Sequence, residues 1–225
     1  EEIVERLIAR GGAIHPKDVP AGQSFTSYIT VGHNHTTPFD AELLKVVLDE
    51  MCAEAGVQVL FHTTFVSPIL EGSALRGLLL MTKAGLRAAQ ANIVIDCTGD
   101  ADVAYRSGVP CEMGDEASGR IQPATMFFRI GNVDLAKVDA DIEANRDNFY
   151  RKDGVNYRSF HWRVSEAREN GDWDLKRVSI GMFRGVKEDE WNINTSRIMG
   201  VDGTDPDSVS AAEVEGRRQV QEIFA

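Results

Sequence analysis

The sequence has few cysteines, no long apolar run and no excess of positive charge. Its three cysteines, Cys52, Cys97 and Cys111, are scattered and form no Cys-x-x-Cys pair, which excludes a disulfide framework and predicts a reducing compartment, the cytoplasm. No apolar stretch reaches the length of a membrane span, and no secretory signal is present. The net charge of −11 argues against nucleic acid or an anionic membrane as a partner.

The most informative segment is 93–104, in which Ile-Val-Ile-Asp is followed by Cys-Thr-Gly-Asp-Ala-Asp-Val-Ala. The pattern predicts a short buried strand, a tight turn of small residues, and a helix that Asp100 or Asp102 caps. Open α/β sheets bind ligands at the carboxyl ends of their strands, so this turn is a candidate binding site. An ordinary strand-to-helix corner is the alternative.

Hydrophobic periodicity and cap residues predict a mixed α/β order of elements along the 225 residues. In the first half, Asp40 caps a helix that Gly56 ends, and apolar alternation then predicts a strand at 57–61. Strands are also predicted at 63–70, 75–82 and 86–91, which short turns separate, and at 93–96. The polar, glycine-rich stretch 114–119 separates two domains. The second half is predicted to contain a strand at 124–130, helices at 135–148 (capped by Asp134) and 159–170, strands at 177–183 and 190–194, and a last helix that begins with a capping box at 210–213.

Several segments, taken together, resemble one known family. They are 37–40 (Thr-Pro-Phe-Asp), 56–59 (Gly-Val-Gln-Val), 96–104 with 107–110 (Ser-Gly-Val-Pro), 122–129 (Gln-Pro-Ala-Thr-Met-Phe-Phe-Arg), 194–197 (Asn-Thr-Ser-Arg) and 203–206 (Gly-Thr-Asp-Pro). This combination, which covers most of the chain, is similar to the FAD-dependent oxidoreductases of the glutathione-reductase-like flavoprotein superfamily.

The resemblance implies a fold and an activity. Residues 1–112 would form the lower half of a Rossmann-like FAD-binding domain with a β-meander, and residues 113–225 would form part of a mixed-sheet substrate domain. The enzyme would pass a hydride or electrons between a small-molecule substrate and FAD. The resemblance assigns no catalytic acid or base and selects no substrate.

The resemblance also implies where FAD lies. The strand that enters the meander would place backbone groups at the adenine, with Phe65 as the best match and Thr64 and Val66 as register alternatives. Thr98, Gly99 and Asp100 would form the closing turn near the flavin.

One feature of the family is missing from the sequence. No Gly-x-Gly-x-x-Gly turn occurs, although backbone amides of that turn hold the cofactor's pyrophosphate. The family's C-terminal segment is also absent, and the chain begins in helix-like sequence without a methionine. We therefore expect an internal piece of a longer enzyme, which by itself is inactive and does not retain FAD.

Other functions remain as alternatives. The cluster of Asp96, Asp100 and Asp102 could hold Mg²⁺ for a hydrolase, although no lysine or serine can be assigned to bind a phosphate. A binding or assembly module without chemistry is a further alternative. The close histidine pair, His33 and His35, lacks further metal ligands nearby and is interpreted as part of a solvated loop, so no metal site is predicted.

Aromatic and arginine side chains alternate in the second half of the sequence. They line a substrate pocket or belong to a hydrophobic core, and the core is the favoured interpretation. The residues concerned are Trp162, Trp173, Trp191, Phe149, Tyr150, Tyr157 and Phe160, with Arg151, Arg158 and Arg163.

Overall fold

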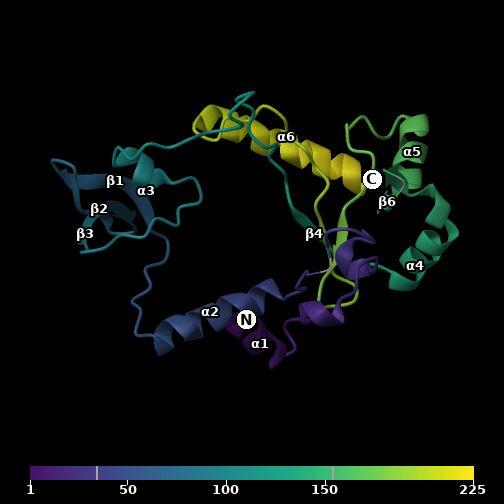
Figure 1. Cartoon of the computed structure of the whole chain (residues 1–225), viewed down its shortest axis with the longest axis horizontal. Coiled ribbons are helices and arrows are strands. Elements are labelled where there is room, and N and C mark those ends of the chain that lie inside the picture. The colour runs from purple at the N-terminus through teal and green to yellow at the C-terminus, as the bar shows by residue number, and fades with distance from the viewer. Residues whose placement is uncertain (34, 154) are drawn as a thin grey trace. The chain divides into compact units, whose positions relative to one another are not determined.

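The structure is a computed structural model that describes residues 1–33, 35–153 and 155–225. The chain divides into two compact units, which Figure 1 shows with the labels used below. Unit 1 contains residues 1–51 and 120–225, and unit 2 contains residues 52–119. The elements are mixed helices and small antiparallel sheets, which confirms the predicted α/β class.

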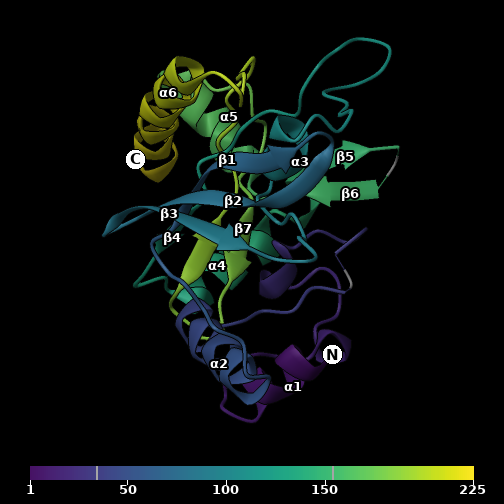
Figure 2. The same cartoon turned by 90° about the vertical axis from the view of Figure 1, so that its left-hand side faces the viewer.

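Unit 2 is built on a three-stranded antiparallel meander in the order β1-β2-β3 (Figure 2). The strands are β1 (Thr64–Glu71), β2 (Ala74–Thr82) and β3 (Gly85–Gln90), and the short helix α3 (Asp102–Arg106) follows them. The meander confirms three of the predicted strands, because short turns that contain glycine separate the apolar segments and bring each pair of neighbours into a hairpin.

Two predicted strands of the same region are absent. Residues 57–61 and 93–96 are not in strands, and the side chains of Ile93 and Ile95 are 81% and 82% exposed. The alternation at 57–61 and the apolar run at 93–95 both fit a strand, but a strand also needs a hydrogen-bonded neighbour, and the described residues supply none at either place. The prediction that 93–96 is a buried strand is therefore wrong for this structure.

The N-terminal part of unit 1 pairs two helices, α1 (Glu2–Ile8) and α2 (Ala41–Glu54). Leu7 and Val47 are buried between them. As predicted, Asp40 caps α2, because its Oδ1 atom accepts hydrogen bonds from the amides of Glu42 (2.8 Å) and Leu43 (3.1 Å).

The rest of unit 1 surrounds a second small sheet. Its antiparallel strands lie in the order β4-β8-β7, and a hairpin, two helices and short 3₁₀ turns flank it. These elements are β4 (Phe128–Ile130), β7 (Met182–Arg184), β8 (Trp191–Ile193), α4 (Leu135–Ala144), β5 (Tyr150–Lys152), β6 (Val155–Arg158), α5 (His161–Asn170), and the 3₁₀ turns η1 (Pro16–Asp18), η2 (Ser24–Thr26) and η3 (Arg146–Asn148).

Trp191 of β8 lies at the centre of the core of this part. Its side chain is fully buried among Tyr28, Ile142, Phe149 and Phe160. Trp173 is buried in a neighbouring cluster. The aromatic residues of the second half are thus mainly a hydrophobic core, as predicted. Half-buried Trp162 donates from Nε1 to Asp141 (2.9 Å), which also pairs with Arg163 (2.7 Å). The side chain of Tyr157 lies outside the described residues.

Two segments that carry the family resemblance lie side by side in unit 1. Ala124 forms a β-bridge with Ile198, and the Thr125 hydroxyl donates to the Ser196 carbonyl (3.0 Å). The Ser196 hydroxyl accepts from the Met126 amide (2.6 Å). Segments 122–129 and 194–197, which are about 70 residues apart in sequence, therefore form one structural feature.

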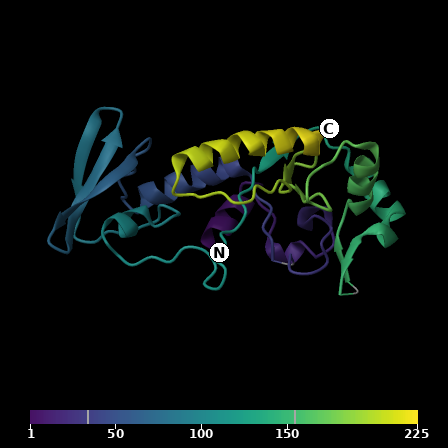
Figure 3. The same ribbon diagram turned by 90° about the horizontal axis from the view of Figure 1, so that it is seen from above.

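The last helix, α6 (Pro206–Phe224), is drawn in yellow in Figure 3. It begins earlier than predicted. Asp205 caps it by accepting from the Asp207 amide (3.1 Å), and Pro206 occupies its first turn. An aspartate followed by proline is a stronger start than the predicted capping box at 210–213, because proline needs no amide partner there. The Ser210 hydroxyl instead donates to the Pro206 carbonyl within the helix (2.7 Å).

Helix α6 packs on the rest of unit 1 through a close contact at Gly216 and through the polar side chain of Gln219, which is buried. A Cβ atom at Gly216 would lie only 3.0–3.1 Å from side-chain atoms of Met126, so this helical glycine allows a close approach. The Gln219 side chain accepts from the Arg197 amide (2.7 Å) and donates to the Arg197 carbonyl (3.2 Å).

Among the described residues, no helix has the length and apolar character needed to cross a membrane.

The carboxylates of α6 predict an acid-labile contact. Hydrogen bonds from Arg218 and then Gln219 lower the pKa of Glu215 from 4.5 to about 2. A depressed folded-state pKa contributes stability that is present above the unfolded pKa and is lost as the pH falls through the folded value. We expect Glu215→Gln to lower the free energy of unfolding at pH 7, and we expect this difference to shrink between about pH 4.5 and pH 3. Urea denaturation across this range measures it.

The matched control for this prediction is Glu213→Gln, which removes an exposed carboxylate from the same helix. It should change the free energy of unfolding by less than about 0.5 kcal/mol. If the effect of Glu215→Gln is the same at pH 7 and pH 3, the ionised carboxylate does not stabilise α6.

Candidate functional site

The candidate site is the turn at residues 96–101 of unit 2, here called the Asp96 turn. Asp96 organises it, because its Oδ1 atom accepts from the amide (3.0 Å) and the hydroxyl (2.7 Å) of Thr98. Its Oδ2 atom accepts from the Ala104 amide inside α3 (2.9 Å). The Thr98 hydroxyl in turn accepts from the Asp102 amide (2.9 Å).

These bonds correct the predicted cap of helix α3. Neither Asp100 nor Asp102 caps it; the residue before its first turn is Ala101, with φ +58° and no side-chain cap. Thr98 and Asp96 satisfy the first amides instead. The spacing Asp-x-Thr, in which a carboxylate can accept from the amide two residues later, was a signal in the sequence for this role.

The charge of the Asp96 turn is fixed by these contacts. The Ala104 amide, followed by the Thr98 hydroxyl and amide, holds the pKa of Asp96 below its ordinary value. Asp96 is therefore ionised at neutral pH. Both of its oxygens already accept hydrogen bonds from the chain.

Gly99 supplies the conformation and the space that a ligand would need. Its φ of +96° lies in the region that favours glycine, and a Cβ atom placed on it would meet no atom within 4 Å. Among the described residues, the amides of Gly99 and Asp100 have no hydrogen-bond partner. The turn thus presents two free donors beside open space.

Helix α3 lies against strand β1, so the Asp96 turn and the start of the meander belong to one feature (Figure 1). The Arg106 guanidinium donates to the Val66 carbonyl (2.8 Å), at a bulge of β1 between Phe65 and Ser67. Phe65 pairs with β2 and is half-buried. Because β1 is an edge strand of its sheet, backbone groups on its outer side have no strand partner within the part of the chain that the structure describes.

The three register alternatives differ in what they already contact. The Val66 carbonyl is occupied by Arg106, whereas Thr64 and Phe65 pair only with Met81 and Leu80 of β2. No described hydrogen bond joins Thr64 or Phe65 to the Asp96 turn. The structure therefore places α3 next to this strand, while the contact of Phe65 with a cofactor stays a prediction.

The other candidate clusters are not brought together for chemistry. Within the described residues, no three His, Cys, Asp or Glu side chains are grouped closely enough to hold a metal ion. His33 stacks on Phe183, with ring centroids 5.6 Å apart, and Asn34 lies outside the described residues. Cys52, Cys97 and Cys111 are free thiols. The magnesium-dependent hydrolase has no support from this arrangement.

Comparison with known proteins bears on the family of the chain. No curated protein and no solved structure matches it. Residues 1–225, the whole chain, match the family described as FAD dependent oxidoreductase. The match spans the meander, the Asp96 turn and the β4-β8-β7 sheet. The chain therefore belongs to the FAD-dependent oxidoreductase family.

Proposed function

We propose that the chain is part of an enzyme that transfers a hydride or electrons between a small-molecule substrate and FAD, and that the Asp96 turn and the start of β1 contact this cofactor. The observation that carries the proposal is Gly99, which combines a positive φ, open space and a free amide. The family supplies the class of reaction.

The residues present fit one part of the cofactor and not another. The free amides of Gly99 and Asp100 suit polar acceptor atoms, and the outer side of β1 suits recognition by backbone groups. The pyrophosphate needs a set of converging amides, and the sequence contains no Gly-x-Gly-x-x-Gly turn to supply them. We therefore propose that this chain alone does not retain FAD.

When bound, the flavin supplies the redox chemistry. The chain binds and orients it. In this proposal, Thr98, Gly99 and Asp100 contact the cofactor near the flavin, and Phe65 contacts the adenine through its backbone. Asp96 holds the turn in place through its hydrogen bonds, and Arg106 joins helix α3 to β1 by donating to the Val66 carbonyl. Rigid placement of both contact points lowers the entropy cost of ordering the cofactor.

We extend the proposal to domains and location. Residues 1–112 would contribute to the FAD-binding domain, and residues 113–225 to the substrate domain. The compact unit 52–119 holds every predicted cofactor contact and supports the first assignment for residues 52–112, whereas residues 1–51 group with residues 120–225. Three free thiols support a cytoplasmic location.

Flavin content tests this function. The full-length product of the gene should purify with about one FAD per chain, whereas the 225-residue chain should be colourless. The measurement is the flavin absorbance band, with the flavin released by acid and identified. A full-length product without flavin would overturn the proposal and favour a binding module. Stoichiometric flavin on the 225-residue chain would contradict the need for a glycine-rich turn.

A further inference from the structure

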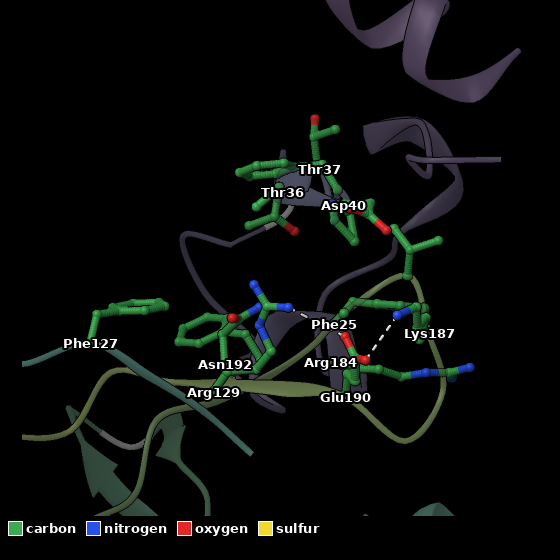
Figure 4. A pocket seen from close by; sticks show the side chains of 16 residues that line it. Phe25, Thr36, Thr37, Asp40, Phe127, Arg129, Arg184, Lys187, Glu190 and Asn192 are labelled. Atoms are coloured by element: carbon green, nitrogen blue, oxygen red, sulfur yellow. Dashed lines mark hydrogen bonds and ion pairs between the residues drawn. The ribbon is translucent and has the colours of Figure 1, made fainter. Parts of the chain in front are cut away.

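Unit 1 contains a pocket of about 530 Å³, which lies within the size range of sites for small organic ligands. Its floor comes from β4, β7 and β8, and residues 36–41 face this floor across the opening (Figure 4). The segment 37–40, which carries part of the family resemblance, therefore forms one wall of the pocket. We call it the phenylalanine–arginine pocket.

The walls of this pocket are aromatic. Phe25, Phe39, Phe127 and Phe183 all line it. Phe127 is 54% exposed and Phe39 is 45% exposed, although both belong to a cavity. Two exposed rings beside two half-buried rings form an apolar surface that a flat or hydrocarbon ligand would cover, with a gain from buried area and ring contacts.

The charge of the pocket is opposite to that of the protein. Three cations, Arg129, Arg184 and Lys187, line it with two carboxylates, Asp40 and Glu190, which leaves one positive charge in a chain of net charge −11. Glu190 is shared, because it pairs with Lys187 at 2.9 Å and with Arg129 at 3.5 Å (Figure 4). Both carboxylates therefore already have partners in the chain, because Asp40 caps α2 and Glu190 forms these two ion pairs.

Arg184 is the cation without a close partner. Its guanidinium carbon lies 4.6 Å from the centroid of the Phe25 ring. Its Nε atom is buried and has no hydrogen-bond partner, and its one described ion pair, with the exposed Glu188, is long at 3.8 Å. The Arg184 side chain is still 21% exposed, so its guanidinium can donate to an acceptor that a ligand supplies.

We propose that the phenylalanine–arginine pocket binds a small organic monoanion, a carboxylate on an aromatic or similarly apolar body. The single surplus charge fits a monoanion, and the fork of Arg184 fits the two oxygens of a carboxylate. Arg129 and the Asn192 amide line the same floor and can donate further hydrogen bonds. Only the role of this ligand as the enzyme's substrate rests on the proposed function.

Three probes test the proposal on the 225-residue chain, without flavin. They are 3-phenylpropionate, the neutral 3-phenyl-1-propanol and the ring-free propionate, each titrated by isothermal calorimetry. We expect 3-phenylpropionate to bind at least about tenfold more tightly than either of the others, since each of these lacks the charge or the ring. Equal binding of the acid and the alcohol, or no binding of the acid, would overturn the proposal.

Two variants locate the site. Arg184→Gln should weaken 3-phenylpropionate at least about tenfold and leave the alcohol unchanged, because one charge-assisted contact is lost. Arg217→Gln removes an exposed arginine of α6 and should leave the affinity for 3-phenylpropionate unchanged. Circular dichroism checks the fold, and Arg129→Gln replaces Arg184→Gln if the latter unfolds. Loss of flavin from the full-length protein would leave these results unaffected, so the two proposals fail separately.

Discussion

Replacing Gly99 with valine in the full-length gene product is expected to abolish flavin retention while the protein stays folded. A Cβ atom at this position would meet nothing within 4 Å, so the folding cost is the backbone strain at φ +96°, about 1–3 kcal/mol. The branched side chain would occupy the space beside the free amides. We expect the affinity for FAD to fall by about 100-fold or more, which is about 2.8 kcal/mol of binding free energy.

The matched control is Gly72→Val. Gly72 also has a positive φ (+58°) and open surroundings, but it lies in the turn after Glu71, at the opposite end of β1 from Thr64. Both variants introduce backbone strain, but only Gly99→Val should lose flavin. Bound flavin per chain is measured, with circular dichroism as the folding check. If both variants retain equal flavin, the Asp96 turn is an ordinary corner.

Truncation of Trp191 to alanine is expected to cost about 3–5 kcal/mol of unfolding free energy in unit 1. The side chain is fully buried, and its Nε1 atom donates to the Glu188 carbonyl (3.1 Å). Its removal leaves a cavity between Tyr28, Ile142 and the neighbouring aromatic rings. All three tryptophans lie in unit 1, so the near-ultraviolet circular dichroism of the remaining two follows the unfolding of this unit.

Phe224→Ala serves as the control for this truncation. Phe224 is 70% exposed, and its removal should change the free energy of unfolding by less than about 0.5 kcal/mol. Similar losses in both variants would mean that Trp191 is not the centre of the core.

Elements with complete local signals were predictable from the sequence. Helix α2 has its cap at Asp40, and Gly56 follows it with a positive φ. The meander consists of apolar segments between short turns that contain glycine, so each hairpin is specified within about 20 residues. These signals depend on neighbours in sequence and not on the rest of the fold.

Strands that depend on distant partners were predictable only in part, since β4 and β8 fall within the predicted strands 124–130 and 190–194. The apolar residues at 57–61 and 93–95 gave no strand, because pairing is a property of two segments and the described residues offer no second one. Ser27 illustrates the same limit in the core. Its hydroxyl accepts from the Met182 amide (2.8 Å) and its carbonyl accepts from the Ser159 hydroxyl (2.9 Å), contacts that span more than 130 residues.

The candidate site was also predictable only where its signals are local in the sequence. The turn of small residues was visible in the sequence, and the positive φ of Gly99 agrees with that interpretation. The sequence did not show that Asp96 and Thr98 form the cap, or that Arg106 joins the helix to Val66. The phenylalanine–arginine pocket was not predicted at all, because Arg129 and Arg184 meet only when β4 and β7 pair with β8.

Amide hydrogen exchange in the full-length gene product, with and without FAD, tests most directly whether the Asp96 turn contacts the cofactor. We expect the amides of Gly99 and Asp100, which have no hydrogen-bond partner among the described residues, to exchange more slowly by about tenfold or more when FAD is bound. The amides of the Gly72 turn should be unaffected. Unchanged exchange at Gly99 and Asp100 in a protein that demonstrably holds FAD would contradict the account.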